Sequence, residues 1–257
     1  MFSPMRAPLF LLVFVVALLL APLIAPADPL HTDAAHQFQP PGAAHLLGSD
    51  LLGRDVLSRA LYGGQHTLLI AALATAIAVV PGVLLGLLGA FGWASRLTAI
   101  LINALLAFPG LLLALMILTL AGQGALPLAL ATGFTQIAPC ARVTRAAVLG
   151  VRSLGYVEAA RSLGAGRGRM IFAHILPNIL TTLLAYSAVI FAYAILNSAA
   201  LSFLGLGGEP AVPDWGVMLS EGRQAFRVAP WIAAVPGVMI TLTIMLVNRA
   251  ADRLSRF

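Results

Sequence analysis

Apolar residues in this chain form long uninterrupted stretches rather than the short periodic runs of a soluble protein. Six stretches can be marked, each close to the roughly 20 residues that a helix needs to cross a bilayer. They span residues 7–25, 66–91, 97–121, 124–141, 178–204 and 229–248. The fourth is interrupted by prolines, a glycine and a glutamine, which neighbouring helices in a membrane can accommodate. The pattern predicts an all-α, polytopic membrane bundle of about six transmembrane helices.

Composition supports a membrane protein. Of the 257 residues, 60% are hydrophobic and 9% are charged, whereas soluble domains carry about 25% charged residues. These values exclude a water-soluble enzyme and a disordered chain. The stretches divide the chain into an N-terminal transmembrane anchor with an outer loop, residues 1–65, and a core of five transmembrane helices, residues 66–257.

The basic residues predict the orientation in the membrane. All 15 of them are arginine, and eleven fall on the side that holds both termini. Because cytoplasmic loops are enriched in arginine and lysine, we expect both termini to be cytoplasmic and the high pI to reflect topology rather than nucleic-acid binding. A cleaved signal peptide ending near residues 25–27 is an alternative for the first stretch, but the length of that stretch favours a retained span.

The predicted spans contain no acid or arginine away from their ends. Transporters that are driven by ion gradients usually keep ionisable groups inside the membrane, so energy is expected to come from elsewhere. Asn103, Tyr186 and Tyr193 lie near the middle of spans and are candidates for lining a polar pathway. The alternative is that they form interhelical hydrogen bonds.

The segment between the fourth and fifth spans, residues 142–177, holds six arginines. Its sequence predicts a short helix from Tyr156 to Leu163, with Glu158 in the first turn, where a negative charge suits the helix dipole. Gly164 supplies the left-handed residue that ends this helix. A second short helix is expected to run to Ile175, and Pro177 is expected at the start of the fifth span.

Ala159 and Ala160 have almost no side chain, so a partner could approach this helix closely. The segment therefore predicts a helix-turn-helix on the cytoplasmic surface. From the residues alone, a basic amphipathic loop that rests on anionic lipid headgroups is an equally good interpretation.

The string EAARSLGAGRGRMIFAHILPN at residues 158–178 resembles the EAA loop of bacterial ABC importer permeases. Further segments resemble the second permease subunit of the dipeptide, oligopeptide and nickel branch of that family. They are HLLGSDLLGRDVLSRALYGG at residues 45–64, LLAFPGLLLA at residues 105–114, and LSFLGLGGEPAVPDWGVMLSEGR at residues 201–223. The compact outer loop and the weakly acidic C-terminal tail depart from the family pattern and leave the substrate subgroup open.

The resemblance implies a type I importer permease in the bacterial inner membrane that translocates peptides. Its implied partners are a second homologous permease, two cytoplasmic ATPases that carry ATP and Mg, and an extracytoplasmic substrate-binding protein. The coupling residues that contact an ATPase would be Glu158, Ala159, Ala160, Gly164, Ile175 and Pro177. An outer gate or a contact with the binding protein would involve Asp50, Arg54, Asp55, Trp215 and Glu221, for which a solvated rim with local salt bridges is the alternative.

No motif for catalysis or for a bound cofactor is expected in this chain. It contains no lysine, and a phosphate-binding loop of the GxxxxGK[ST] kind requires one, so ATP hydrolysis is expected on other subunits. The histidines of the outer loop are irregularly spaced and predict no metal site. A nickel or other small-solute importer permease and a membrane scaffold that transports nothing are the alternative functions.

Overall fold

The computed structural model describes residues 7–91, 94–207 and 212–254, and within these ranges the chain is helical without strands. The helices are α1 (Ala7–Leu19), α2 (Ala21–Ile24), η1 (Ala34–His36), α3 (Val56–Gly89), α4 (Ala94–Ala107), α5 (Gly110–Ala121), α6 (Ala125–Arg152), α7 (Gly155–Ser162), α8 (Arg167–Arg169), η2 (Met170–Ile175), α9 (Leu176–Phe203), α10 (Trp215–Ala225) and α11 (Trp231–Leu254). The predicted all-α class is confirmed.

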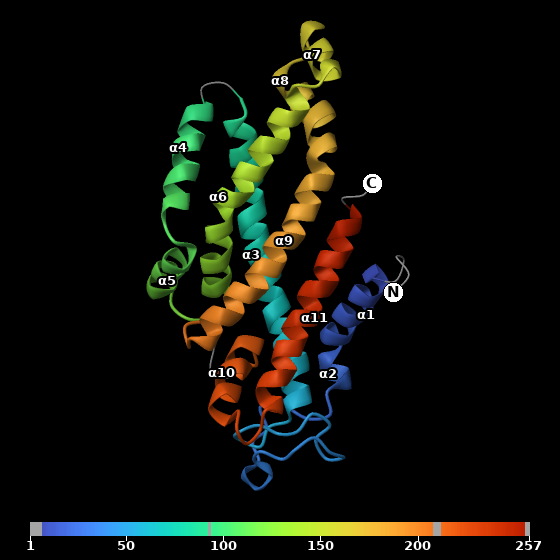
Figure 1. Ribbon diagram of the computed structural model, residues 1–257, viewed down its shortest axis with the longest axis vertical. Coiled ribbons are helices and arrows are strands. Elements are labelled where there is room, and N and C mark those ends of the chain that lie inside the picture. The colour runs from blue at the N-terminus through green and yellow to red at the C-terminus, as the bar shows by residue number, and fades with distance from the viewer. Residues whose placement is uncertain (1–6, 92–93, 208–211, 255–257) are drawn as a thin grey trace.

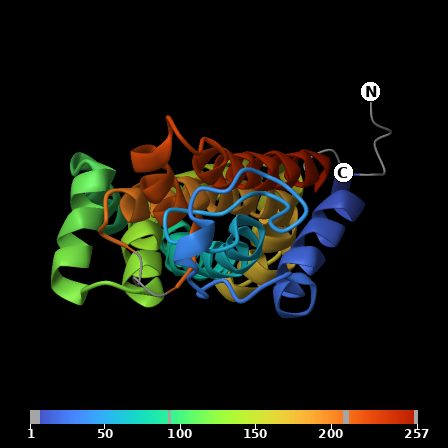
Figure 2. The ribbon, with the colours of Figure 1, turned by 90° about the horizontal axis from the view of Figure 1, so that it is seen from below.

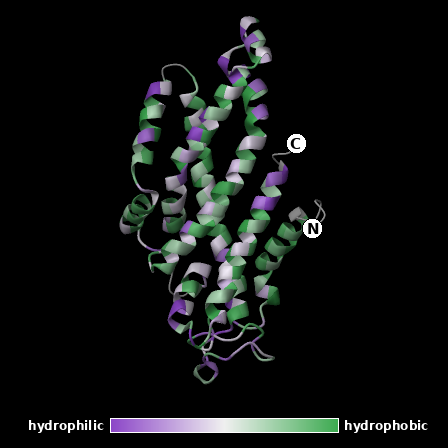
Figure 3. Cartoon of the chain, in the orientation of Figure 1, coloured by the Kyte–Doolittle hydropathy of each residue, from purple (hydrophilic) through white to green (hydrophobic). Residues whose placement is uncertain are grey.

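The long helices lie roughly side by side and form an elongated bundle (Figure 1). Residues 25–55 form a looped segment at one end, which we call the loop end, and Figure 2 shows this segment spread across that end. The helices α7 and α8 project from the opposite end, which we call the arginine end. Apolar residues cover most of the helices between the two ends (Figure 3).

The centre of the bundle is the pair α3 and α6, which pack along much of their length. Glycines permit this close approach: a Cβ atom added at Gly82 would lie 2.6 Å from the Cβ of Cys140, and one added at Gly86 would lie 2.5 Å from the Cβ of Thr144. The Gly-x-x-x-Gly pattern therefore serves packing within this chain. The division that the sequence predicts at residue 65 falls inside α3, so the outer loop and the core share this helix.

The remaining helices enclose the central pair. The helix α9 packs against α3, α6 and α11, and α1 packs against α11 and α3. The short helix α10 contacts α9 and α11 near the loop end. At Gly216, on α10, an added Cβ would lie 2.4 Å from the carbonyl oxygen of Ala199, so backbone meets backbone there.

The third predicted span, residues 97–121, is two helices rather than one. The helices α4 and α5 meet at an angle of 87° around Phe108 and Pro109. Proline lacks the N–H that a continuing helix requires and disfavours helical geometry at the residue before it. The segment is therefore a broken span or a re-entrant loop.

By length and composition, three helical segments could cross a membrane: Val56–Gly89, Arg167–Phe203 and Trp231–Arg253. The bent pair would make four, which is fewer than the six predicted. The described part of α1 has 13 residues and is short for a span. The helix α6 has 28 residues, but it is less apolar because it contains Gln136 and three arginines, Arg142, Arg145 and Arg152.

Candidate coupling site and transport groove

The helix α7 has a defined start and end. Glu158 lies in its first turn and Arg161 in its last turn, and both charges match the helix dipole. After the last turn, the N–H of Ala165 donates to the carbonyl oxygen of Ala160 at 3.0 Å, and the N–H of Gly164 donates to that of Arg161 at 3.0 Å. This pair of bonds is the Schellman motif. Gly164 has a φ of +85°, which confirms its predicted left-handed conformation.

One face of α7 packs against the protein and the other faces outward. Val157 is buried and holds the helix against η2 and α6. Glu158, Ala159 and Gly164 are exposed, and Ala160 is half-buried. With Pro177, which is also exposed, five of the six predicted coupling residues are therefore accessible to a partner that approaches the arginine end.

Large apolar side chains are also exposed around α7, and the sequence analysis did not select them. Leu163 is 89% exposed and Phe172 is 72% exposed. Exposed apolar side chains that form a patch on a surface mark interaction sites. The signal that could have identified them is an apolar residue placed beside a helix-ending glycine in an otherwise basic segment.

The second half of the segment differs from the expected separate helix. The segments α8, η2 and α9 form one continuous helical run, and η2 is a π-helical stretch immediately before Pro177. Pro177 lies in the first turn of α9, as predicted for the start of the fifth span, and it is exposed. Ile175 is fully buried in a cluster with Val148 and Ile179, so its side chain packs within the protein and does not reach a partner.

Arg152 connects the last turn of α6 to the end of α3. Its guanidinium lies 4.7 Å from the centre of the Phe91 ring, and Nη1 donates to the carbonyl oxygen of Ala90. A guanidinium over an aromatic face is attracted by the ring quadrupole. This contact fixes the helix end from which α7 projects.

At the loop end, four charged side chains form a buried group that we call the ion cluster: Asp50, Arg54, Arg59 and Glu221. Arg54 donates from Nε to Asp50 at 2.7 Å and from Nη2 to Glu221 at 2.9 Å. Arg59 donates from Nη1 to Glu221 at 2.5 Å and also to Asp50. Asp50 is fully buried and Arg59 is 3% exposed. The local salt bridges of the alternative interpretation are present, but Asp50, Arg54 and Arg59 are buried and Glu221 is half-buried, so they do not form a solvated rim.

The ion cluster joins three parts of the protein that are distant in sequence. Asp50 and Arg54 come from the looped segment, Arg59 from the start of α3, and Glu221 from α10. In the sequence, Arg59 is one of the four arginines on the side opposite the termini, and no motif assigns it to a site. Arg59 lies within the first turns of an apolar helix, where an unpaired charge would be costly. That position indicates a charged partner elsewhere in the protein.

Asp55 and Trp215 hold the same region together without joining the ion cluster. The carboxylate of Asp55 caps α3 by accepting from the backbone N–H of Ser58 at 2.7 Å, and it lies 3.0 Å from Nδ1 of His45. The buried Trp215 donates from Nε1 to the carbonyl oxygen of Ala60 at 2.8 Å. Both residues fix the loop end rather than forming an accessible surface.

Between α9 and α11 lies a groove of about 780 Å³. Tyr186 and Tyr193 line it from α9, where their spacing of seven residues places them on one face. Asn248 lines it from α11. The remaining wall is mainly aliphatic, so a few polar groups are set into an apolar surface.

Asn103 does not belong to this groove. It lies on α4, on the other side of the bundle from α11 (Figures 1 and 2). Its side-chain oxygen accepts a hydrogen bond from Nη2 of Arg142 at 3.2 Å. The structure thus brings together two of the three predicted pathway residues. In the described ranges, no three metal-ligating side chains are grouped in a way that could hold an ion.

Residues 78–257 match the family described as the binding-protein-dependent transport system inner membrane component. The chain belongs to this family. It is 39% identical to the di/tripeptide transport system permease protein DppC of Pseudomonas aeruginosa, over 96% of this chain and 84% of that protein. It is 35% identical to the glutathione transport system permease protein GsiD of Pectobacterium atrosepticum, over 96% of this chain and 83% of that protein.

Solved structures agree on the fold. The chain resembles a permease-containing structure of the MetNI methionine ABC transporter with a TM-score of 0.63 and 20% identity, covering 78% of this chain and 96% of that chain. Together with these relatives, the family match makes the protein a membrane permease of an ABC importer, whose family works with an ATPase and a binding protein.

Proposed function

We propose that this chain is the second permease subunit of a bacterial inner-membrane importer for di- and oligopeptides. Relatives named for di/tripeptide and glutathione transport match it over nearly the whole chain at 39% and 35% identity. This similarity is the observation that carries the proposal. The subunit pairs with a homologous permease, and two ATPases bind ATP and Mg on its cytoplasmic side. A separate binding protein delivers the peptide from the other side.

The orientation assigns the arginine end to the cytoplasm and the loop end to the outside. Both termini are proposed to be cytoplasmic, although the terminal residues themselves lie outside the described ranges. The excess of arginine on one side of the predicted spans supports this orientation.

The groove between α9 and α11 has the chemistry that a peptide requires. A peptide backbone presents both donors and acceptors at every residue. The hydroxyl groups of Tyr186 and Tyr193 and the amide of Asn248 can each donate and accept, while the aliphatic wall accommodates side chains of different sizes. We propose that this groove forms this subunit's half of the pathway.

The coupling role falls to α7 and its surroundings. Glu158, Ala159, Ala160 and Gly164 are proposed to contact an ATPase, with the exposed Leu163 and Phe172 supplying apolar contact area. At the other end, the ion cluster fixes α10 and the looped segment as the surface that meets the binding protein or closes the mouth. ATP-driven closure of the ATPase pair would then move α7 and rock the two permeases between their inward and outward openings.

The first experiment identifies the cargo. The complete importer, purified with its binding protein, is analysed by mass spectrometry for retained peptides and by metal analysis for nickel. Retained di- or oligopeptides support the proposal. Retained nickel contradicts the peptide assignment, and a chain that purifies without an ATPase or a second permease contradicts the transport role.

The second experiment tests coupling in vesicles that contain the complete importer. Glu158→Gln should reduce both peptide uptake and peptide-stimulated ATP hydrolysis while the subunit still inserts. Arg96→Gln removes one charge from an exposed position on α4, away from α7 and from the loop end, and should leave both activities unchanged. Uptake by Glu158→Gln at the wild-type rate would contradict the coupling role.

A further inference from the structure

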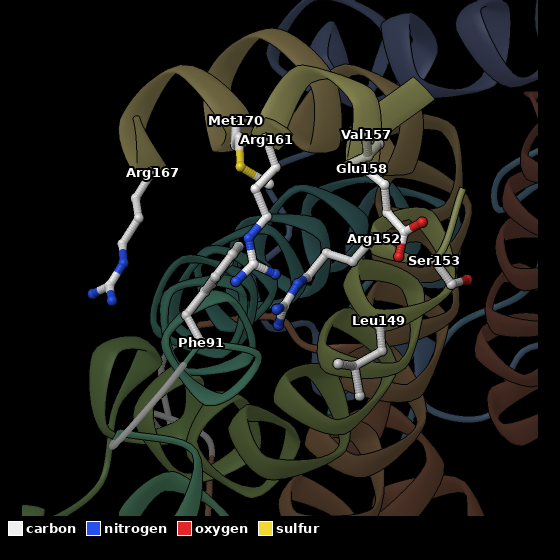
Figure 4. Close-up of a pocket in the computed structure, with 9 residues that line it drawn as sticks. All are labelled: Phe91, Leu149, Arg152, Ser153, Val157, Glu158, Arg161, Arg167 and Met170. Atoms are coloured by element: carbon white, nitrogen blue, oxygen red, sulfur yellow. The ribbon is translucent and has the colours of Figure 1, made fainter. Parts of the chain in front are cut away.

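A pocket of about 520 Å³ lies at the arginine end, beneath α7 (Figure 4). Its apolar lining comes from four different elements. Phe91 follows the end of α3, Leu149 lies in the last turns of α6, and Val157 and Met170 come from α7 and η2. An apolar lining of this kind next to the ends of membrane helices can accept the first carbons of a lipid chain.

The polar lining is strongly basic. Arg152, Arg161 and Arg167 line the pocket, and Glu158 is the one carboxylate among the lining residues. Figure 4 shows the guanidinium ends of Arg152 and Arg161 directed into the same part of the pocket, beside the ring of Phe91, with Arg167 at its edge. Three positive charges therefore surround a space that holds one negative charge.

These arginines are not neutralised by the protein. Among the described residues, the arginines that form ion pairs are Arg54 and Arg59, and neither Arg161 nor Arg167 has a carboxylate within 4 Å. Arg152 contacts a carbonyl oxygen and an aromatic ring, neither of which carries a formal charge. Each guanidinium has five N–H donors, so most of the donors at this site remain available to a ligand.

We propose that this pocket binds the phosphate group of an anionic phospholipid from the cytoplasmic leaflet. Guanidinium groups match phosphate oxygens in pairs of parallel hydrogen bonds. Basic pockets between membrane helices on the cytoplasmic side suit lipid headgroups of this class. The pocket combines arginines with an apolar lining. The phosphate of an anionic phospholipid can bind the arginines while its acyl chain contacts the apolar lining, whereas a soluble anion can use the arginines alone.

The pocket adjoins the surface proposed for the ATPase and shares only Glu158 with the residues proposed for that contact. Leu163 and Phe172 are exposed and do not line it, whereas Val157 is buried and does. A lipid bound here would occupy the space between α7 and the bundle and would set how far α7 stands from the membrane. The bound lipid would thereby regulate coupling without contacting the cargo.

The test measures retained lipid on the complete importer in mild detergent, using native mass spectrometry with added phosphatidylglycerol. The double variant Arg161→Gln/Arg167→Gln should bind the lipid more weakly by about fivefold for each arginine removed. Arg169→Gln is the matched control, because Arg169 lies in the same segment and does not line the pocket. Glu158→Gln should act in the opposite direction and increase retention, because it removes the one negative charge of the lining.

Each outcome has a defined meaning. Equal phosphatidylglycerol retention in the wild type, the double variant and the control overturns the proposal, and lost ATPase association in the double variant would then assign the arginines to that contact. If excess inorganic phosphate displaces phosphatidylglycerol from the wild type, the arginines bind phosphate but the proposed lipid occupant is overturned in favour of a soluble anion. The detergent-solubilised importer has no sides, so this test does not depend on the proposed orientation or cargo.

Discussion

Gly164 offers a direct test of how the end of α7 supports coupling. Its φ is +85°, and an added Cβ would meet no atom within 4 Å. Gly164→Ala therefore introduces no collision, and its cost is the backbone strain of a left-handed alanine, about 1–2 kcal/mol. A cost of that size shifts the balance between the ordered and the frayed helix end by about 5- to 30-fold.

The assay compares peptide-stimulated ATP hydrolysis and peptide uptake by the complete importer in vesicles. We expect Gly164→Ala to lower both strongly, because a frayed helix end cannot transmit movement from an ATPase. Gly164→Asn should retain more activity, since asparagine tolerates the left-handed conformation better than alanine does. Gly166→Ala is the control: Gly166 has a φ of −65° and equally open space around it.

Three results would refute this reasoning. They are full activity in Gly164→Ala, an equal loss in Gly166→Ala, or an asparagine variant that is less active than the alanine variant. A loss of inserted protein in the membrane fraction would show that the substitution acts on folding, so insertion is quantified for every variant.

Other variants test packing, charge and protonation. Gly86→Ala should destabilise the α3–α6 pair by about 1–3 kcal/mol and lower the unfolding temperature in detergent. Gly150→Ala is the control and should not lower it, because a Cβ added at Gly150 meets no atom within 4 Å. Glu221→Gln should lower the free energy of unfolding by about 3–5 kcal/mol, because a buried arginine loses its charged partner. Adding Arg59→Met should restore part of that loss in the same thermal assay. A further drop in the unfolding temperature would contradict the ion cluster. The pKa of Asp33 is lowered from 3.8, first by a hydrogen bond from a histidine side chain, so the turn that it caps should be intact above pH 3.8 and lost as the pH falls through its lowered pKa. Carboxyl NMR titration measures that midpoint, and a midpoint at or above 3.8 would contradict the hydrogen bond.

Hydropathy was sufficient to predict the helical membrane fold and the approximate positions of α3, α9 and α11. The start and end of α7 could be predicted from local residues alone. A carboxylate in the first turn and a glycine after the last turn stabilise helix ends without any tertiary contact. Tyr186 and Tyr193 could be placed together for a similar reason, since helical spacing alone puts them on one face.

The break between α4 and α5 could not be predicted with the same security. A proline in a membrane helix is compatible with a kink or with a complete break, and the choice depends on which neighbours satisfy the freed backbone groups. The apolar residues on both sides of Pro109 are equally consistent with one straight span.

The ion cluster was beyond sequence reasoning for a different reason. Arg59 and Glu221 are 162 residues apart, so no local pattern connects them, and each alone reads as an ordinary outer charge. Ile175 shows the same limit in the opposite direction. Its motif suggested a contact with a partner, but the tertiary packing of α6 against the η2–α9 helix buries it.

The continuous run from Arg167 to Phe203 has 37 residues, which corresponds to about 55 Å at the usual rise of an α-helix. It begins two residues after the Schellman turn of α7 and carries both groove tyrosines. A tilt of one degree about its arginine end would displace its far end by about 1 Å. Small angular changes at the proposed ATPase contact would therefore become ångström-scale changes in the width of the groove. The π-helical stretch η2, before Pro177, is the place where this helical run can bend.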